Sequence, residues 1–219
     1  MAPGMAGVYR VARADIGLGR WAEAQALLDA LPAGSPHSSL LQAELAFVRG
    51  DFAQAEDHAR AALGQVAGPA REGFLFRLAE IELYRGRFTA AREHAHAGLV
   101  IARAAADRTR ICRWNNLLGE IEYFSGNVDA AAGLVDRALT ELEAMPEHER
   151  DQTLLAGLLQ NTALVRGASG DWRAALRRQQ QAVRGAALWR HACERYDRRT
   201  VAVDRLVDQL LVCLAYDRH

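Results

Sequence analysis

Apolar residues recur at intervals of three and four along most of the chain, and each such run ends near a glycine. Leu75, Leu78 and Leu83 precede Gly86 with this spacing, and polar residues occupy the positions between them. The run resumes after the glycine in Phe88, Ala91, Ala95 and Leu99. A period near 3.6 residues is typical of an amphipathic helix. The pattern therefore predicts two helices joined by a turn at Gly86.

The same arrangement occurs five times, each time marked by the phrase Gly-x-aromatic-x-x-Ala. Its copies begin at Gly19, Gly50, Gly86, Gly126 and Gly170, and Val128 replaces the aromatic residue in the fourth copy. The intervals between successive glycines are 31, 36, 40 and 44 residues, by subtraction. Glycine adopts a positive φ at little cost, which suits the tight turn after a helix. We therefore expect five helix pairs.

Small residues stand at fixed distances on both sides of these glycines, where two helices of a pair have to approach closely. Seven residues before the glycines are Ala12, Ala43, Ala79, Gly119 and Ala163, and five residues after them are Ala24, Ala55, Ala91, Ala131 and Ala175. The aromatic residue after each glycine is expected to anchor the second helix between neighbouring pairs. Helix boundaries are predicted at Pro32, Pro36, Pro69 and Pro146, and Asp107 is predicted to cap a helix.

This pattern resembles the tetratricopeptide repeat (TPR) family. The first helices carry the small-residue step Leu78-Ala79 or Leu118-Gly119. The second helices end on a small residue followed by an apolar one, in Ala62-Leu63, Gly98-Leu99, Ala138-Leu139 and Ala182-Val183. The usual period of the family is about 34 residues. The longer repeats here are similar to those of kinesin light chains and of the C-terminal arms of large bacterial transcription activators.

The resemblance implies an all-α fold, a right-handed α-solenoid of antiparallel helix pairs. It would form one domain over residues 1–219, with repeats at about 5–34, 36–67, 69–106, 107–145 and 147–190. A further helix is predicted over about residues 196–215. Its apolar stripe consists of Val203, Leu206, Val207, Leu210, Leu211 and Leu214. We interpret this helix as a cap on the last repeat, because solenoid ends have to be shielded from water. The alternative is that it forms a homodimer or interdomain surface.

The composition excludes several classes of function. All 27 basic residues are arginine, so the chain has no lysine for a P-loop, a kinase site or a Schiff base. The absence of lysine and the 43 alanines are typical of a GC-rich genome. The resemblance to the longer repeats of bacterial activators implies a bacterial source. A formal net charge of zero argues against direct nucleic-acid binding. No apolar segment is long enough for a membrane span, and no leader sequence precedes the first repeat, so we expect a cytoplasmic protein.

The resemblance also predicts a partner-binding groove lined by the first helices. The position six residues before each turn glycine, which faces the groove in the family, holds Arg13, Glu44, Glu80, Glu120 and Leu164. Aromatic and polar residues flank this column, and the residues predicted to bind a partner are Tyr9, Arg13, Glu44, Phe76, Arg77, Glu80, Tyr84, Arg113, Asn116, Glu120, Tyr123 and Asn161. The three acids suggest a partner with basic residues. Alternatively, they form inter-repeat ion pairs with arginine, which stabilise the fold by about 0–1 kcal/mol each when exposed.

Some members of the family hold a C-terminal carboxylate with lysine and asparagine. Without lysine, Asn116 together with Arg77 and Arg113 would have to replace that clamp, since arginine binds carboxylates in a bidentate manner. Catalytic and metal sites are not expected. His94 and His96 point to different sides of a helix, and Cys193 beside His191 lacks a third partner. We therefore predict no catalytic residue, no metal and no cofactor.

The function that these observations favour is a non-enzymatic interaction module or scaffold that binds a peptide or protein segment in its groove. The alternative is a regulatory or ligand-sensing arm of a bacterial transcription activator. The sequence contains no DNA-reading motif of its own.

Overall fold

The computed structural model describes residues 3–17, 19–32 and 34–194, and every regular element in these ranges is helical. The first helices of the five pairs are α1 (Pro3–Gly17), α3 (Pro36–Val48), α5 (Glu72–Tyr84), α7 (Arg108–Phe124) and α9 (Gln152–Ala168). The second helices are α2 (Trp21–Asp29), α4 (Phe52–Leu63), α6 (Phe88–Ala104), α8 (Val128–Glu143) and α10 (Trp172–Glu194). Two short 3-10 turns, Gly68–Arg71 and Glu147–Glu149, precede α5 and α9. The predicted all-α class is confirmed.

The turn glycines have the predicted backbone conformation. The φ angles of Gly19, Gly50, Gly86, Gly126 and Gly170 lie between 71° and 90°. A side chain at such a φ is strained, which explains why glycine occupies all five turns. At Gly86 the chain then returns through a hydrogen bond from the Arg87 backbone N–H to the Glu82 carbonyl.

The small-residue positions lie where helices of a pair touch. Ala43 and Ala55 are fully buried between α3 and α4, as are Ala79 and Ala91 in their helices. At Gly119 in α7, a Cβ atom would lie only 2.5 Å from Val135 Cγ1 of α8. Because real Cβ atoms do not approach that closely, a side chain at position 119 would force Val135 or one of the two helices to shift.

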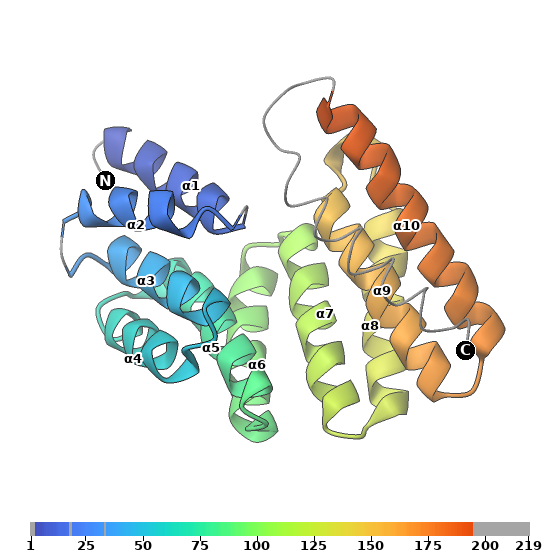
Figure 1. Cartoon of the computed structure of the whole chain (residues 1–219). Coiled ribbons are helices and arrows are strands. Elements are labelled where there is room, and N and C mark those ends of the chain that lie inside the picture. Colours follow the sequence, from blue (N-terminus) through green and yellow to red (C-terminus); the bar gives the residue numbers. More distant parts are fainter. Residues whose placement is uncertain (1–2, 18, 33, 195–219) are drawn as a thin grey trace. The chain divides into compact units, whose positions relative to one another are not determined.

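The chain divides into two compact units, residues 1–101 and residues 102–219. In the first unit, α1 packs on α2 and α3 packs on α4, and the first helices α1, α3 and α5 contact one another in sequence. Its core includes Ile16, Leu28 and Leu41. Figure 1 shows α1 to α4 as two neighbouring antiparallel pairs.

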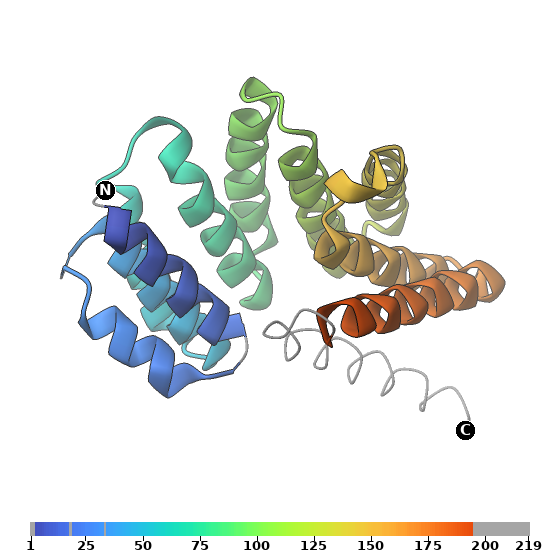
Figure 2. The same cartoon turned by 90° about the horizontal axis from the view of Figure 1, so that it is seen from above.

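The second unit repeats this arrangement with longer helices. Here α7 packs on α8 and α9 on α10, while α9 also contacts both α7 and α8. The amber α9 and the orange-red α10 run side by side in both views (Figures 1 and 2). Leu139, Leu142 and Leu158 form the centre of the core. In each unit the first helices therefore form a row of their own.

Side-chain caps fix where several helices begin. Asp107 accepts a hydrogen bond from the Arg110 backbone N–H at the start of α7, as predicted. Asp51 and Asp151 cap α4 and α9 in the same way, and Ser35 caps α3 immediately before Pro36. Each cap satisfies a backbone donor that the first helical turn leaves unpaired.

The predicted cap helix at residues 196–215, and any homodimer formed through it, lie outside the described residues. Among the helices that the structure describes, none is long and apolar enough to cross a membrane. The aromatic residue after the fifth turn does not behave as predicted. Trp172 is 71% exposed, whereas Phe52 and Val128, its counterparts in the second and fourth pairs, are half-buried.

Candidate functional site

All twelve residues predicted to bind a partner lie on first helices, in two groups that belong to different units. The group in the first unit consists of Tyr9 and Arg13 on α1, Glu44 on α3, and Phe76, Arg77, Glu80 and Tyr84 on α5. The group in the second unit consists of Arg113, Asn116, Glu120 and Tyr123 on α7, and Asn161 on α9.

In the first unit, charged side chains link three first helices. Glu44 Oε1 lies 3.2 Å from Arg13 Nε of α1 and 3.5 Å from Arg77 Nη2 of α5. Arg77 Nη1 also lies 2.8 Å from Glu80 Oε2. The Glu44 side chain is only 5% exposed and that of Arg77 only 14%. Glu44 is therefore an internal partner of two arginines, and little of its carboxylate remains for a basic ligand.

An aromatic cluster lies beside this polar network. The guanidinium of Arg77 sits 4.7 Å above the centre of the Phe47 ring, a cation–π arrangement. Phe47 meets Tyr84 edge to face at 5.3 Å, and Phe52 stacks on Tyr84 at 5.8 Å. Tyr84 is 66% exposed, so it offers aromatic surface to solvent on the α5 end of the cluster. Sequence reasoning missed Phe47 as a site residue, although it stands three positions before Gly50.

The other aromatic residues of this group are less exposed. Tyr9 is half-buried and contacts His37 edge to face at 5.4 Å. Burial raises the pKa of Tyr9 above its ordinary value, and the charge of Glu44 adds to the shift. The Tyr9 hydroxyl is therefore neutral at physiological pH and can act as a hydrogen-bond donor. Phe76 is also half-buried.

In the second unit, two amides and one carboxylate form the corresponding network. The Asn161 side-chain N–H₂ of α9 donates to Glu120 Oε1 at 2.5 Å and to Asn116 Oδ1 at 2.9 Å. Asn116 Nδ2 in turn lies 3.4 Å from Glu120 Oε1. The network joins α7 to α9 through groups that are only partly buried. Its three predicted members are therefore brought together by the fold.

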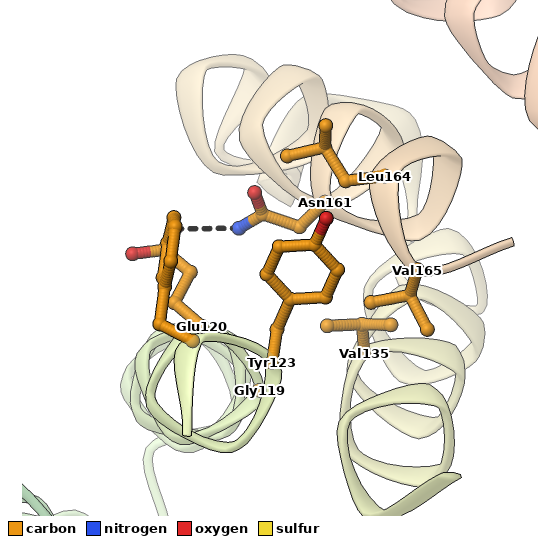
Figure 3. A pocket seen from close by; sticks show the side chains of 8 residues that line it. Gly119, Glu120, Tyr123, Val135, Asn161, Leu164 and Val165 are labelled. Atoms are coloured by element: carbon orange, nitrogen blue, oxygen red, sulfur yellow. Dashed lines mark hydrogen bonds between the residues drawn. The ribbon is translucent and has the colours of Figure 1, made fainter. Parts of the chain in front are cut away.

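The network borders a shallow hollow between α7, α8 and α9. Figure 3 shows Tyr123 lying between α7 and α9, with the Asn161–Glu120 hydrogen bond at one edge. The hollow is small and partly open to solvent, and it is lined by Gly119, Glu120, Tyr123, Phe124, Val135, Asn161, Leu164 and Val165. Phe124 is 59% exposed and Leu164 44%. An apolar surface thus lies directly beside hydrogen-bonding amides.

The arginines of the predicted carboxylate clamp are engaged inside the protein. Arg113 Nη2 donates to Asp151 Oδ2 at 2.9 Å. Arg77 is held by Glu44 and Glu80 within the first unit. A carboxylate ligand would therefore have to displace an acidic side chain of the protein itself, which makes the clamp a poor description of this site.

The first unit contains a second polar cluster, which was not predicted from the sequence. Glu82 of α5 is fully buried, and it accepts a hydrogen bond from Arg60 of α4 at 3.0 Å and forms an ion pair with Arg87. Glu56 joins the same arginines. Burial alone would raise the pKa of Glu56, but the hydrogen bonds from Arg87 and Arg60 lower it below its ordinary value. The cluster joins α4 to α5 and has a structural role.

A spacing rule would have found part of this cluster. Residues four before and one after a turn glycine bond to each other in three pairs: Asp15 with Arg20, Glu82 with Arg87, and Glu122 with Asn127. In these three turns the residue pair thus links the end of the first helix to the start of the second.

Within the described ranges there is no group of three or more His, Cys, Asp or Glu side chains that could hold a metal ion. Cys112 is buried, and burial raises the pKa of its thiol, so it is a poor nucleophile. The side chain of Cys193 lies outside what the structure describes.

No protein-family model and no curated protein matches the sequence. Solved structures do match. BtubC (BKLC) from P. vanneervenii is 21% identical with a TM-score of 0.64, over 84% of this chain and 87% of that chain. A kinesin light chain-like protein from Podosopora anserina with nearly identical TPR-like repeats is 17% identical with a TM-score of 0.60, over 85% and 96%.

A third match is the Rap conjugation gene regulator of the plasmid pLS20 in complex with the Phr* peptide. It is 13% identical with a TM-score of 0.61, over 84% of this chain and 55% of that chain, so this chain spans about half of its length. At these identities the matches establish the fold and not the function. The chain has a TPR-like fold of stacked helix pairs, as the sequence motifs predict.

Proposed function

We propose that this chain is a non-enzymatic interaction module that binds a peptide or a segment of another protein on the faces of its first helices. The observation that carries the proposal is the hollow of the second unit. There the amides of Asn116 and Asn161 adjoin the exposed apolar surface of Phe124 and Leu164.

This combination suits an extended polypeptide. A main chain offers alternating N–H and C=O groups, and an asparagine amide has two donors and one acceptor. Because the Asn161 side-chain N–H₂ already donates to Glu120 and Asn116, a main-chain N–H of the partner would bond to Asn161 Oδ1. Apolar side chains of the partner would remove Phe124 and Leu164 from water, at about 25 cal/mol for each Å² buried. Such a site fixes a segment by its backbone and selects it by a few anchor side chains.

The first unit supports the same interpretation. Its first helices also carry a polar network, Glu44–Arg77–Glu80, beside an exposed aromatic ring, Tyr84. Because the acids of this network are paired with arginine, we propose that a partner of this unit contacts the aromatic surface of Tyr84 rather than these acids. A partner that relies mainly on basic residues fits less well.

The Rap regulator in the comparison binds the Phr* peptide, which is consistent with a peptide or protein partner for this fold. The alternative of a sensing arm in a transcription activator has no separate structural observation in its favour.

The proposal is tested by selecting binders from a displayed library of random 12-residue peptides against the full chain. We expect affinity for the selected peptides to fall at least tenfold in the variant Asn116→Ala with Phe124→Ala. The matched control is Arg137→Ala, on the exposed surface of α8. Selected peptides that bind this double variant and the parent chain equally well would contradict the proposal.

A further inference from the structure

Arginines flank the turn glycines of the first unit. The arginines directly beside Gly19, Gly50 and Gly86 are Arg20, Arg49, Arg85 and Arg87, and all four are exposed. We call these four residues the arginine edge. The second unit carries no arginine at the corresponding positions, which hold Ser125, Asn127, Ser169 and Asp171. Exposed basic groups are therefore gathered at the turns of the first unit.

Contacts between the first helices show that these three turns lie side by side. Arg13 and Glu44 each stand six residues before their turn glycine, and Glu44 Oε1 lies 3.2 Å from Arg13 Nε. Phe47 and Tyr84 stand three and two residues before theirs, and their ring centres are 5.3 Å apart. Because these contacts join residues at nearly equal distances from the turns, α1, α3 and α5 end level with one another. Packed helices are about 8–10 Å apart, so successive turns have about that separation.

Buried carboxylates hold three of the four guanidinium groups in place. Arg20 Nη2 lies 2.5 Å from Asp15 Oδ1, and the Asp15 side chain is only 8% exposed. Arg85 and Arg87 contact Glu56 Oε2 at 2.6 and 2.5 Å, and the Glu56 side chain is only 12% exposed. The acids thus lie on the protein side of the arginine edge, and the arginines present their charge to solvent.

The arginine edge keeps hydrogen-bond donors for a ligand. A guanidinium has five N–H donors. Arg20 contacts its acid through Nη2 and Arg85 through Nη1, so the other N–H groups of both remain. Arg77 differs, because two acids hold it and its side chain is only 14% exposed. A carboxylate can therefore bind at the arginine edge without displacing an acid of the protein.

The charge of these turns favours an acidic partner. Asp51 is the one acid directly beside the three turn glycines, and its Oδ1 already accepts a hydrogen bond from the Gln54 backbone N–H. The four arginines outnumber this carboxylate, and guanidinium groups bind carboxylates in a bidentate manner. A nucleic acid fits less well, because its binding depends on the summed field of many basic groups and the formal net charge of the chain is zero.

The spacing of the turns selects a conformation for the partner. A polyproline II segment has three residues per turn and rises about 3.1 Å per residue, so every third side chain lies on the same side, about 9 Å apart. This distance matches the separation of successive turns. We propose that the arginine edge binds an acidic segment of a partner protein in the polyproline II conformation, with a carboxylate at every third residue. The surface lies outside the first-helix faces proposed above, so neither proposal requires the other.

Fluorescence anisotropy with labelled synthetic peptides tests the proposal on the full chain. The probe is the peptide DPPDPPDPP, which presents an aspartate at every third position. We expect it to bind at least fivefold more tightly than NPPNPPNPP, which lacks the charges. It should also bind at least threefold more tightly than DDDPPPPPP, which has the same composition but not the spacing.

The variant Arg49→Gln with Arg85→Gln should weaken binding of the probe at least fivefold. Its fold is expected to persist, since Glu56 keeps its ion pairs with Arg60 and Arg87. Arg49→Gln alone, which removes no printed ion pair of the unit, should weaken binding at least twofold. The matched control, Arg71→Gln with Arg103→Gln, removes two exposed arginines at the helix ends away from these turns and should leave binding unchanged.

Three results would overturn the proposal. The first is equal affinity for the three peptides, because the chain would then read neither the charge nor its spacing. The second is an equal loss of affinity in the edge variant and the control, since net charge alone would then be responsible. The third is tighter binding of a labelled oligouridylate of the same length, which would assign the arginine edge to single-stranded nucleic acid.

Discussion

The side-chain amide of Asn161 on α9 donates a hydrogen bond of 2.5 Å to Glu120 Oε1 on α7 (Figure 3). The same amide reaches Asn116 Oδ1 at 2.9 Å, so one asparagine holds two neighbours of the adjacent first helix. This arrangement orients the polar edge of the hollow before any partner arrives. Preorganisation of this kind reduces the entropy that binding costs.

Replacing Asn161 by aspartate places a second carboxylate against Glu120. We expect Asn161→Asp to lower the free energy of unfolding by about 2 kcal/mol at pH 7, because two carboxylates repel and the donated hydrogen bond is lost. The loss should shrink as the pH falls to about 4, where one carboxyl group of the pair takes up a proton. Urea unfolding at both pH values measures this. If adding Glu120→Gln does not recover stability at pH 7, the repulsion is not the cause.

Gly119→Ala tests the close approach of α7 and α8. The added Cβ would lie 2.5 Å from Val135 Cγ1, so we expect a loss of about 1–3 kcal/mol in the free energy of unfolding. Gly133→Ala on α8 is the control, because nothing lies within 4 Å of its Cβ position. It should stabilise the protein by about 0.5–1 kcal/mol, as expected when a helical glycine becomes alanine. Thermal unfolding that ranks the two variants in the opposite order would refute this packing.

The cap residue Asp107 is expected to make the stability of the start of α7 depend on pH. The backbone N–H and then the guanidinium of Arg110 lower the pKa of Asp107, because both bond to its charged form. A lowered pKa adds stability that is present above the unfolded value of about 3.9 and is lost as the pH falls through the folded value. Asp107→Ala should therefore cost about 1 kcal/mol at pH 7 and less below pH 4. A gap that stays constant from pH 7 to pH 3 in denaturant titrations argues against the charged cap.

His94 is expected to make the stability of the protein depend on pH at higher pH values than Asp107 does. Burial lowers the pKa of His94, and the nearby charge of Arg60 lowers it further. The unfolded chain then binds a proton at about pH 6.5 that the folded chain does not, so stability falls as the pH drops through that value. His94→Gln should flatten this part of the stability profile, while the control His148→Gln, at an 81% exposed side chain, should not. Equal slopes in all three proteins would show that His94 is not the group responsible.

The turns and helix pairs were predictable because they depend on local features. Gly126 has a positive φ of 90°, and the burial of Ala55 and Ala131 follows directly from their fixed distance to a turn glycine. Such features repeat in the sequence, so each copy supports the others. The Glu82 cluster was not predictable in the same way, because its partner Arg60 belongs to the preceding pair, 22 residues away.

In the candidate site, too, the positions of residues on the helices were predictable, whereas the burial of their side chains was not. The register relative to the glycines correctly placed Glu44, Asn116 and Asn161 on first helices. It did not reveal that Glu44 is nearly buried by two arginines, since burial depends on neighbouring side chains rather than on register. Nor did it show that Trp172 would be 71% exposed, since exposure also depends on neighbouring side chains.

The central claim is that a partner segment lies on the first helices of the second unit. Nuclear magnetic resonance of the side-chain amides of Asn116 and Asn161 tests it most directly, in a titration of the full chain with a peptide selected as described above. Binding on this surface predicts that both amide pairs shift and saturate together with the peptide, along with the methyl groups of Leu164. Shifts confined to α8 and α10, with both asparagine amides unmoved at saturation, would contradict the claim.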